Sequence, residues 1–424
     1  MPRLLSINNY HYRRGGAEAV YLDQQALFAE AGWETAEFAM QHPRNIDSRF
    51  SRYFVEEIEF GRDYGLLQKL RMAAKIIHSP EARRKMGMLL DDFDADVAHV
   101  HSVYHHISPS VLPVLSERGV PVVLTAHDLK LLCPAYTMLR DGRPCEECAG
   151  SSTIHAFRHR CIKGSGMLSA LIAMESGIHR LQGVYRKHVD RLVAPSMFYR
   201  DKFVEYGWPE EQVSYVPNFL VAENFEPRYE PGDYFVFVGR LSYEKGVDTL
   251  VRAAAAANAP LRVVGDGPLR QSLQDQYGGK HASIHFEGFQ SGDDLWNLIR
   301  GSRALVIPSE WYENAPISVL EAYAAGKPVI GAEIGGIPEL IETGETGWLF
   351  ESGSADGLAE VLGEVMAMPA SDIQEMGRAA RNRVESRHSP ATYRSNLQAV
   401  YESIGVEPEA TADKVMHQGA GAAP

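Results

Sequence analysis

The sequence predicts an α/β fold with two parallel β-sheets, each in a domain of its own. Its 424 residues are enough for two or three domains. Short apolar runs alternate with helical patterns in the first half, and the same alternation restarts in the second half. Residues 217–233, which contain three prolines and a glycine, separate the two series and predict a hinge.

The expected strands are short apolar runs followed by Gly, Ser or Asp and then a helical pattern, as is typical of βαβ units. In the first half they are residues 4–7, 35–40, 97–101, 120–125, 192–195 and 213–216. In the second half they are residues 234–238, 261–264, 284–286, 304–307, 329–332 and 348–350. The two series predict two Rossmann-like domains, residues 1–216 and 217–389.

The end of the chain divides into a helix and a tail. A helical pattern covers about residues 390–404, and the chain ends in Gly-Ala-Gly-Ala-Ala-Pro. Residues 406–424 cannot bury enough apolar surface to order themselves, so we expect a disordered tail.

Composition narrows the class of protein. The chain is 45% hydrophobic and 23% charged, which is typical of a soluble globular protein. No apolar run approaches the length of a bilayer span, and the N-terminus reads as a strand rather than a signal peptide, so we expect a cytoplasmic protein. A net charge of −13 argues against general nucleic-acid binding.

One stretch is basic, although the chain as a whole is acidic. Residues 44–85 hold ten Lys or Arg against six acids, together with apolar residues such as Leu66, Leu67 and Ile77. Two interpretations stay open. The favoured one is a helical insertion with a solvated charged face; the other is peripheral contact with an anionic membrane, at its inner face, or with a lipid-linked phosphate.

Two carboxylates eight residues apart flank a proline: Glu313, Pro316 and Glu321. This spacing is too long for neighbours on one helical face. If a helix begins near Pro316, Glu313 lies in the loop before it and Glu321 lies inside it. That arrangement suits a ligand with two hydroxyl-bearing parts and a phosphate between them. The alternative is an amphipathic surface helix with solvated acids.

Cationic and glycine-rich loops follow the first strand of each series. After Gly239, a loop presents Arg240 and Lys245 at the end of a strand, where parallel sheets bind ligands. A guanidinium fork and a mobile ammonium together suit a diphosphate. Gly15 and Gly16 follow the first strand of the chain, where backbone amides can approach phosphate oxygens.

These segments closely resemble the Glu-x7-Glu and Gly-Arg-Leu…Glu-Lys-Gly elements of retaining glycosyltransferases with the GT-B fold, in particular glycosyltransferase family 4. The resemblance covers most of residues 1–404 and is strongest from 234 to 350. It implies two Rossmann-like domains facing across a cleft. The first domain would bind the acceptor and the second the nucleotide-sugar donor, with a last helix, residues 390–405, crossing back onto the first domain.

The resemblance also implies roles for the two acids and a histidine. Glu313 would bond hydroxyls of the donor sugar, and Glu321 would bond the ribose hydroxyls. His127, which follows an apolar strand, would orient the donor sugar across the cleft, through its ring and its carbonyl. The alternative for His127 is a strand-terminal histidine bonded to a neighbouring loop.

The remaining donor-contacting positions are strand-end loops and helix N-termini. Many family members have Gly where this chain has Pro316, which lacks an N–H, so the amides of Ile317 and Ser318 would meet the phosphate or sugar. The other expected contacts are Gly15, Gly16, Gly239, Asp266, Gly267, Gly288, Phe289 and Ala315.

The implied activity is a retaining hexosyltransferase that uses a UDP- or GDP-sugar and a hydroxyl acceptor in polysaccharide, glycolipid or glycoconjugate assembly. No catalytic divalent metal is expected, because Arg240 and Lys245 would replace it at the diphosphate. The alternatives are a GT-B sugar-nucleotide epimerase or phosphorylase, and a catalytically degenerate sugar-binding subunit. The degenerate subunit is disfavoured because Arg240, Lys245, Glu313 and Glu321 occur together.

All four cysteines fall in one short region with the spacing Cys-x11-Cys-x2-Cys-x12-Cys: Cys133, Cys145, Cys148 and Cys161. In a cytosolic protein this pattern predicts a structural zinc site with four thiolate ligands. Free thiols remain an alternative, as does a redox pair or iron–sulfur site. The local sequence also resembles that of a subgroup of polysaccharide-building family 4 enzymes.

Overall fold

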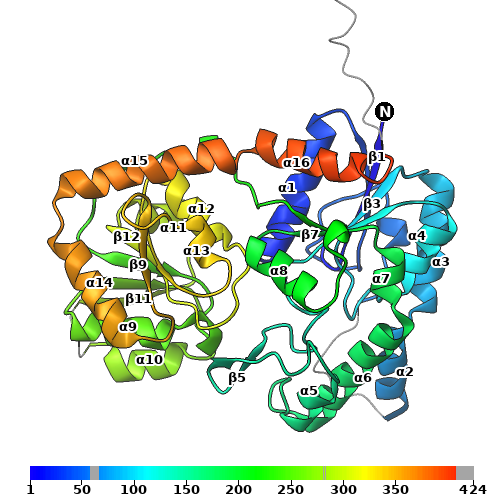
Figure 1. The fold of residues 1–424 in the computed structure, drawn as a ribbon, viewed down its shortest axis with the longest axis horizontal. Helices are drawn as coiled ribbons and strands as arrows, with labels where there is room; N and C mark the ends of the chain where they lie inside the picture. Colours follow the sequence, from blue (N-terminus) through cyan, green and yellow to red (C-terminus); the bar gives the residue numbers. More distant parts are fainter. Residues whose placement is uncertain (58–65, 280, 282, 407–424) are drawn as a thin grey trace, which may run out of the picture. The chain divides into compact units, whose positions relative to one another are not determined.

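The computed structural model describes residues 1–57, 66–279, 281 and 283–406 (Figure 1). The predicted tail from residue 407 onward and part of the basic stretch, residues 58–65, lie outside the described residues. The chain divides into two compact units. The first comprises Met1–Thr125, His179–Leu192 and Arg394–Pro424, and the second comprises Ala126–Ile178 and Val193–Tyr393.

The predicted strands of both series are confirmed. The first sheet has the order β2-β1-β3-β4-β7-β8, and the β1–β2, β1–β3 and β3–β4 pairs are parallel. Its strands are β1 (Arg3–Asn8), β2 (Glu34–Phe38), β3 (Val97–Ser102), β4 (Val122–Thr125), β7 (Arg191–Ala194) and β8 (Val213–Tyr215).

The second sheet has the order β11-β10-β9-β12-β13-β14, and all of these neighbours pair in parallel. Its strands are β9 (Phe235–Val238), β10 (Leu261–Val264), β11 (Ile284–Gly288), β12 (Ala304–Ile307), β13 (Val329–Ala332) and β14 (Gly347–Phe350). Because β10 lies on one side of β9 and β12 on the other, the strand order reverses between β9 and β12.

Helices cover both faces of the second sheet (Figure 1). One face packs against α9 (Val247–Ala256), α10 (Arg270–Tyr277) and α14 (Ala355–Ala367). The opposite face packs against α11 (Gly292–Arg300), α12 (Ile317–Ala324), α13 (Ile337–Leu340) and α15 (Ala370–Arg387). Two apolar layers therefore bury the strands on both sides, which explains their continuous hydrophobic runs.

The other helices are α1 (Gly16–Glu30), α2 (Leu66–Ile77), α3 (Pro80–Asp92), α4 (Leu112–Glu117), α5 (Ile154–Arg158), α6 (Gly166–Gln182), α7 (Val184–His188), α8 (Met197–Glu205) and α16 (Pro390–Glu402). Short 3₁₀ turns occur at Ser51–Tyr53, Pro109–Val111, Glu210–Gln212, Ala222–Asn224 and Tyr243–Lys245. A small antiparallel hairpin, β5 (Leu139–Arg140) and β6 (Arg143–Pro144), was not predicted. In the described part of the chain, no helix is long and apolar enough to cross a membrane.

The sheets change within the predicted hinge, since β8 ends at Tyr215 and β9 begins at Phe235. The boundaries of the compact units lie elsewhere. The domain limits 1–216 and 217–389 therefore remain a prediction, as does the cleft between the domains.

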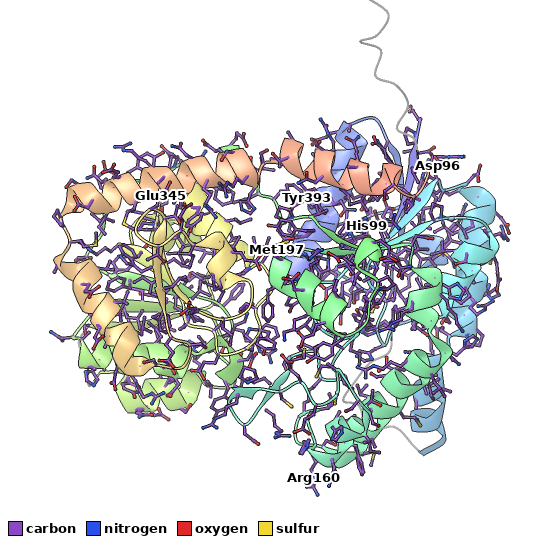
Figure 2. The ribbon with its side chains drawn as sticks, in the orientation of Figure 1. Asp96, His99, Arg160, Met197, Glu345 and Tyr393 are labelled. Carbon is purple, nitrogen blue, oxygen red and sulfur yellow. The ribbon has the colours of Figure 1, made fainter. Side chains whose placement is uncertain are left out.

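The last helix returns to the first unit, as predicted. Tyr401 of α16 is buried, and its hydroxyl lies 2.7 Å from Nδ1 of His99 on β3. Nε2 of the same ring lies 2.7 Å from the hydroxyl of Thr125 at the end of β4. His99 is labelled in Figure 2 and is fully buried, so it is a core histidine that links α16 to the sheet.

This link predicts a stability effect. We expect Tyr401→Phe to lower the free energy of unfolding by about 1–2 kcal/mol, because the buried His99 nitrogen loses a hydrogen-bond partner. Tyr215→Phe is the matched control, since Tyr215 is 40% exposed. Urea unfolding of both variants checks the prediction, and equal midpoints would contradict it.

Candidate functional site

The two acids of the Glu-x7-Glu segment lie where the sequence predicts. Helix α12 begins at Ile317 with Pro316 as its N-cap residue. Glu313 lies in the loop between β12 and α12, and Glu321 lies inside the helix. The amides of Ile317 and Ser318, in the first turn of α12, have no acceptor within the helix and remain available to a ligand.

Lys245 and Glu313 form an ion pair at the point where the strand order reverses. Lys245 follows β9 and Glu313 follows β12, and these strands are parallel neighbours. Nζ of Lys245 lies 2.6 Å from Oε1 of Glu313, and the hydroxyl of Ser309 donates to the same oxygen at 2.8 Å. The crevice beyond such a reversal is where open parallel sheets bind ligands.

Burial differs between the two partners. Glu313 is 6% exposed as a residue, whereas the Lys245 side chain is 28% exposed. The ammonium also lies 5.0 Å from the centroid of the Trp311 ring, within the range of a cation–π contact. Lys245 thus has a fixed position and still presents donors to solvent.

A glycine turn holds the Glu313 loop in place. The amide of Gly336 donates to the carbonyl of Glu313 at 2.9 Å. A Cβ at Gly335 would collide with the backbone of Glu313, and one at Gly336 with the carbonyl of Asn314. Gly335 also has φ +60°, which favours glycine. The close approach of the Gly335–Gly336 turn to the backbone of Glu313 and Asn314 fixes the position of the Glu313 loop beyond the end of β12.

The predicted strand-end glycines come together beyond β9, β10 and β11. The amide of Gly239 donates to Val264, and the amide of Gly265 donates to Gly288. A Cβ at Gly265 would collide with the carbonyl of Gly239, and one at Gly267 with the backbone of Leu241. The backbones pack too closely there for side chains, so these loops form one compact rim.

Polar and aromatic groups project from this rim. Arg240 is exposed, and the structure gives its guanidinium no hydrogen bond or ion pair with any described residue. Asp266 accepts from the amide of Gly267 at 2.7 Å and lies 3.3 Å from Arg270. Phe289 is 73% exposed, and its ring is free to stack on a flat ligand.

His127 is connected to the Glu313 loop by Asn314, a residue that the sequence reasoning missed. Nδ2 of Asn314 donates to the carbonyl of Ala126 at 2.9 Å and approaches that of His127 at 3.4 Å. The hydroxyl of Ser196 donates to Oδ1 of the same Asn314 side chain at 2.9 Å. Burial lowers the pKa of His127 to about 4, so its ring is neutral at pH 7.

The only sequence signal for Asn314 was a polar amide directly after Glu313 inside an otherwise apolar motif. Trp311 and Ser309 were also missed. Trp311 contacts Lys245, and Ser309 donates to the Glu313 oxygen that pairs with Lys245. No local sequence pattern reveals that the loop carrying Lys245 lies beside them.

Glu321 is partly exposed. Its carboxylate makes no hydrogen bond or ion pair with any described residue. Burial raises its pKa to about 7. A carboxyl group with that pKa and no protein partner is a candidate ligand group.

Gly15 and Gly16 lie in the first unit, exposed at the start of α1. The carboxylate of Glu18 approaches the backbone there. Burial raises the pKa of Glu18, and hydrogen bonds from the amides of Glu18 and Gly15 partly oppose that rise. A phosphate at this helix N-terminus would therefore compete with the Glu18 carboxylate.

The four predicted metal ligands also come together. Cys133, Cys145, Cys148 and Cys161 line one small cavity, and none of them forms a disulfide. Cys133 and Cys148 are buried.

Comparisons with known proteins agree with the architecture. A family model described as "Glycosyltransferase Family 4" matches residues 14–223, and one described as "Glycosyl transferases group 1" matches residues 222–383. Glycogen synthase of Mycobacterium tuberculosis is 29% identical over 298 residues, covering 66% of this chain and 68% of that protein.

Solved structures show the same fold at low identity. Anabaena HepE in complex with UDP and glucose has a TM-score of 0.65 and 17% identity, covering 95% of this chain and 100% of that one. Sucrose-phosphate synthase from Thermosynechococcus elongatus has a TM-score of 0.68 and 17% identity, covering 95% and 99%. The GT-B fold, with two Rossmann-like domains, is therefore confirmed.

The raised pKa of Glu321 predicts a pH-dependent stability. The folded chain holds this proton up to about pH 7, whereas a glutamate in the unfolded chain loses it near pH 4.5, so its contribution to stability falls as pH rises through that window. We expect the gain in unfolding free energy on Glu321→Gln to be larger at pH 8 than at pH 5 by about 2 kcal/mol. Urea unfolding at both pH values measures it, with the exposed Glu345→Gln as control. An equal gain at both pH values would contradict the burial of Glu321.

Proposed function

The chain belongs to the glycosyltransferases of family 4, and on that premise we propose that it transfers a sugar from a nucleoside-diphosphate sugar to a hydroxyl acceptor with retention of configuration. The observation that carries the proposal is the Lys245–Glu313 pair, which lies where the strand order of the second sheet reverses, with the unpaired Arg240 in the same loop as Lys245.

The two cations suit the diphosphate of the donor. A lysine ammonium has three donors, and Glu313 engages Lys245 through one oxygen, so other donors remain for phosphate oxygens. Arg240 is exposed and unpaired among the described residues. Because the leaving nucleoside diphosphate gains charge as the glycosidic bond breaks, these cations stabilise the transition state more than the ground state. They take the place of a divalent metal.

Glu313 is suited to a second task. Lys245 and Ser309 both donate to Oε1, and among the described residues no hydrogen bond is made to Oε2. Oε2 is therefore left to accept a hydrogen bond from a hydroxyl of the donor sugar. Its buried position makes the bond directional and strong.

Glu321 and the rim of strand-end loops receive the nucleoside. The ribose diol offers two donors to the unpartnered Glu321 carboxylate, and the exposed Phe289 ring offers a surface for the base. The amides of Ile317 and Ser318 lie between Glu313 and Glu321 in sequence, so the phosphate or sugar meets them at the start of α12.

The reaction needs no protein nucleophile. The acceptor hydroxyl attacks the anomeric carbon on the face from which the diphosphate departs, and a leaving phosphate oxygen takes the proton. The neutral ring and the carbonyl of His127, the latter held by Asn314, orient the sugar. The protein contributes position and charge stabilisation.

The donor is a UDP- or GDP-sugar and the product a polysaccharide, glycolipid or glycoconjugate. The presence of UDP and glucose in the Anabaena complex and the likeness to a glycogen synthase support this choice. The protein acts in the cytoplasm. Lys75 and Lys85 of the basic stretch pair with Glu81, so their charges are balanced locally, which disfavours contact of these two cations with an anionic membrane.

We expect Arg240→Ala and Lys245→Ala each to lower kcat/KM. The loss should correspond to a rise of about 2–4 kcal/mol in activation free energy, the cost of losing one oxyanion-type donor. Arg252→Ala on the surface of α9 is the control, because Arg252 is half exposed and pairs with Asp248. Steady-state rates of nucleoside-diphosphate release measure the effect. Near-normal turnover in both variants would refute the diphosphate assignment.

A panel of nucleotide sugars separates the candidate functions. We expect one donor to raise the melting temperature and then to release nucleoside diphosphate only when an acceptor is present. Conversion of the donor without an acceptor would instead indicate an epimerase. Binding without any turnover would indicate a degenerate sugar-binding subunit.

A further inference from the structure

The cysteine module, residues 133–165, is a compact segment whose four cysteines meet at one cavity. Cys133 precedes the β5–β6 hairpin, Cys145 and Cys148 follow it, and Cys161 follows α5. All four are free thiols. The thiols therefore reach the cavity from three places along the chain.

This module has very little apolar core. Its buried apolar residues are few and, apart from Met138, small: Cys133, Ala135, Met138, Cys148 and Ala156. Two larger apolar side chains of the module are exposed, Ile154 at 54% and Phe157 at 45%. Its strands β5 and β6 have two residues each, and α5 has five. A segment with so small a core ordinarily needs a disulfide or a metal to hold its shape.

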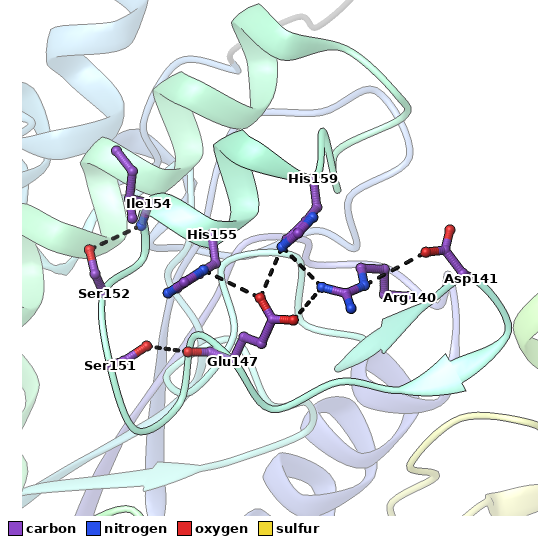
Figure 3. Close-up of polar contacts among 8 residues, drawn as sticks. All are labelled: Arg140, Asp141, Glu147, Ser151, Ser152, Ile154, His155 and His159. Carbon is purple, nitrogen blue, oxygen red and sulfur yellow. Dashed lines mark hydrogen bonds and ion pairs between the residues drawn. The ribbon is translucent and has the colours of Figure 1, made fainter.

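A second set of possible ligands borders the same cavity. Oxygen and nitrogen atoms of Glu147, His155 and His159 lie within 4.8 Å of one another. Figure 3 shows both imidazoles directed at the Glu147 carboxylate, with Arg140 contacting Glu147 and His159. A dication there would have to displace the Arg140 guanidinium, so this set is a poor metal site.

The four thiols are the better ligands. Thiolates in a Cys-x2-Cys arrangement with two more cysteines suit tetrahedral zinc. The four thiols line the cavity, but among the described residues no three of their sulfurs lie within 4.8 Å of one another, so zinc binding would draw the sulfurs inward.

The module is tied to the candidate active site through Glu146, which lies between Cys145 and Cys148. The hydroxyl of Tyr312 donates to Oε1 of Glu146 at 2.8 Å, and Lys202 of α8 lies 2.8 Å from the same oxygen. Tyr206 donates to Oε2.

Tyr312 is held by its backbone as well. Its carbonyl accepts from the hydroxyl of Tyr199 at 3.2 Å. Since Tyr312 directly precedes Glu313, its position determines where the Glu313 carboxylate meets Lys245.

We propose that the four cysteines bind one structural zinc ion, and that this site positions the Glu313 loop through Glu146 and Tyr312. On binding, the four thiols lose their protons to solvent and become thiolate ligands. The metal fixes Cys145 and Cys148, and thereby the direction of Glu146 between them. Glu146 is a positioning residue for donor binding, a role that rests on the proposed function. The zinc site itself does not rest on the proposed function.

The metal is tested first on the purified full-length chain. We expect one zinc per chain by elemental analysis, and four thiols that react with a thiol reagent only after a chelator is added. Re-addition of zinc should protect the thiols again. A chain with four titratable thiols that does not take up added zinc would overturn the site, as would a disulfide among them. These readouts do not depend on glycosyl transfer.

The positioning role is tested with Glu146→Gln against Glu205→Gln. Glu205 also pairs with Lys202, at 2.9 Å, so it is the matched control. We expect Glu146→Gln to keep its zinc and its melting temperature but to weaken binding of UDP or GDP, whichever the wild type binds, about tenfold. Glu205→Gln should change neither. Equal affinity in the two variants would overturn the positioning role, as would zinc loss in Glu146→Gln.

A double-mutant cycle localises the coupling. We expect Tyr312→Phe to weaken nucleotide binding to the same extent as Glu146→Gln, and the double variant to be no weaker than either. Additive losses would show that Glu146 does not act through Tyr312. If no nucleotide binds to the wild-type chain, the proposed function fails, while the zinc measurements still decide the metal site.

Discussion

The ion pair between Lys245 and Glu313 is the interaction on which the candidate site depends. It joins the loops that follow β9 and β12, the two strands between which the sheet order reverses. Glu313 is almost fully buried, and a buried carboxylate without a cation would carry a large desolvation penalty. Lys245 supplies that cation while keeping its ammonium partly in solvent. The pair thus fixes the position of the Lys245 ammonium beyond the carboxyl ends of the strands.

Backbone packing makes this pair possible. Gly335 and Gly336 allow one turn to lie directly against Glu313 and Asn314, and Gly265 and Gly267 allow the neighbouring strand-end loops to touch. Asn314 then extends the arrangement to the carbonyls of Ala126 and His127. The loops therefore place a carboxylate, a cation and a neutral imidazole on a rigid frame.

The strands and the start of α12 could be predicted from sequence because their signals are local. Apolar runs mark buried parallel strands, and Pro316 marks the start of α12. The pairing of Lys245 with Glu313 could not be predicted, because it depends on β9 and β12 being neighbours although 65 residues or more separate them. The same holds for Glu146, whose contacts to Lys202, Tyr206 and Tyr312 come from distant segments. The β5–β6 hairpin was missed because two-residue strands leave no periodic signal.

The most direct test is a crystal structure of the chain with the nucleoside diphosphate that it binds, with UDP and GDP tried first. We expect the diphosphate to lie within hydrogen-bond distance of Nζ of Lys245 and of the Arg240 guanidinium, with Glu321 on the ribose and Glu313 still beside Lys245. A diphosphate bound away from both cations would contradict it.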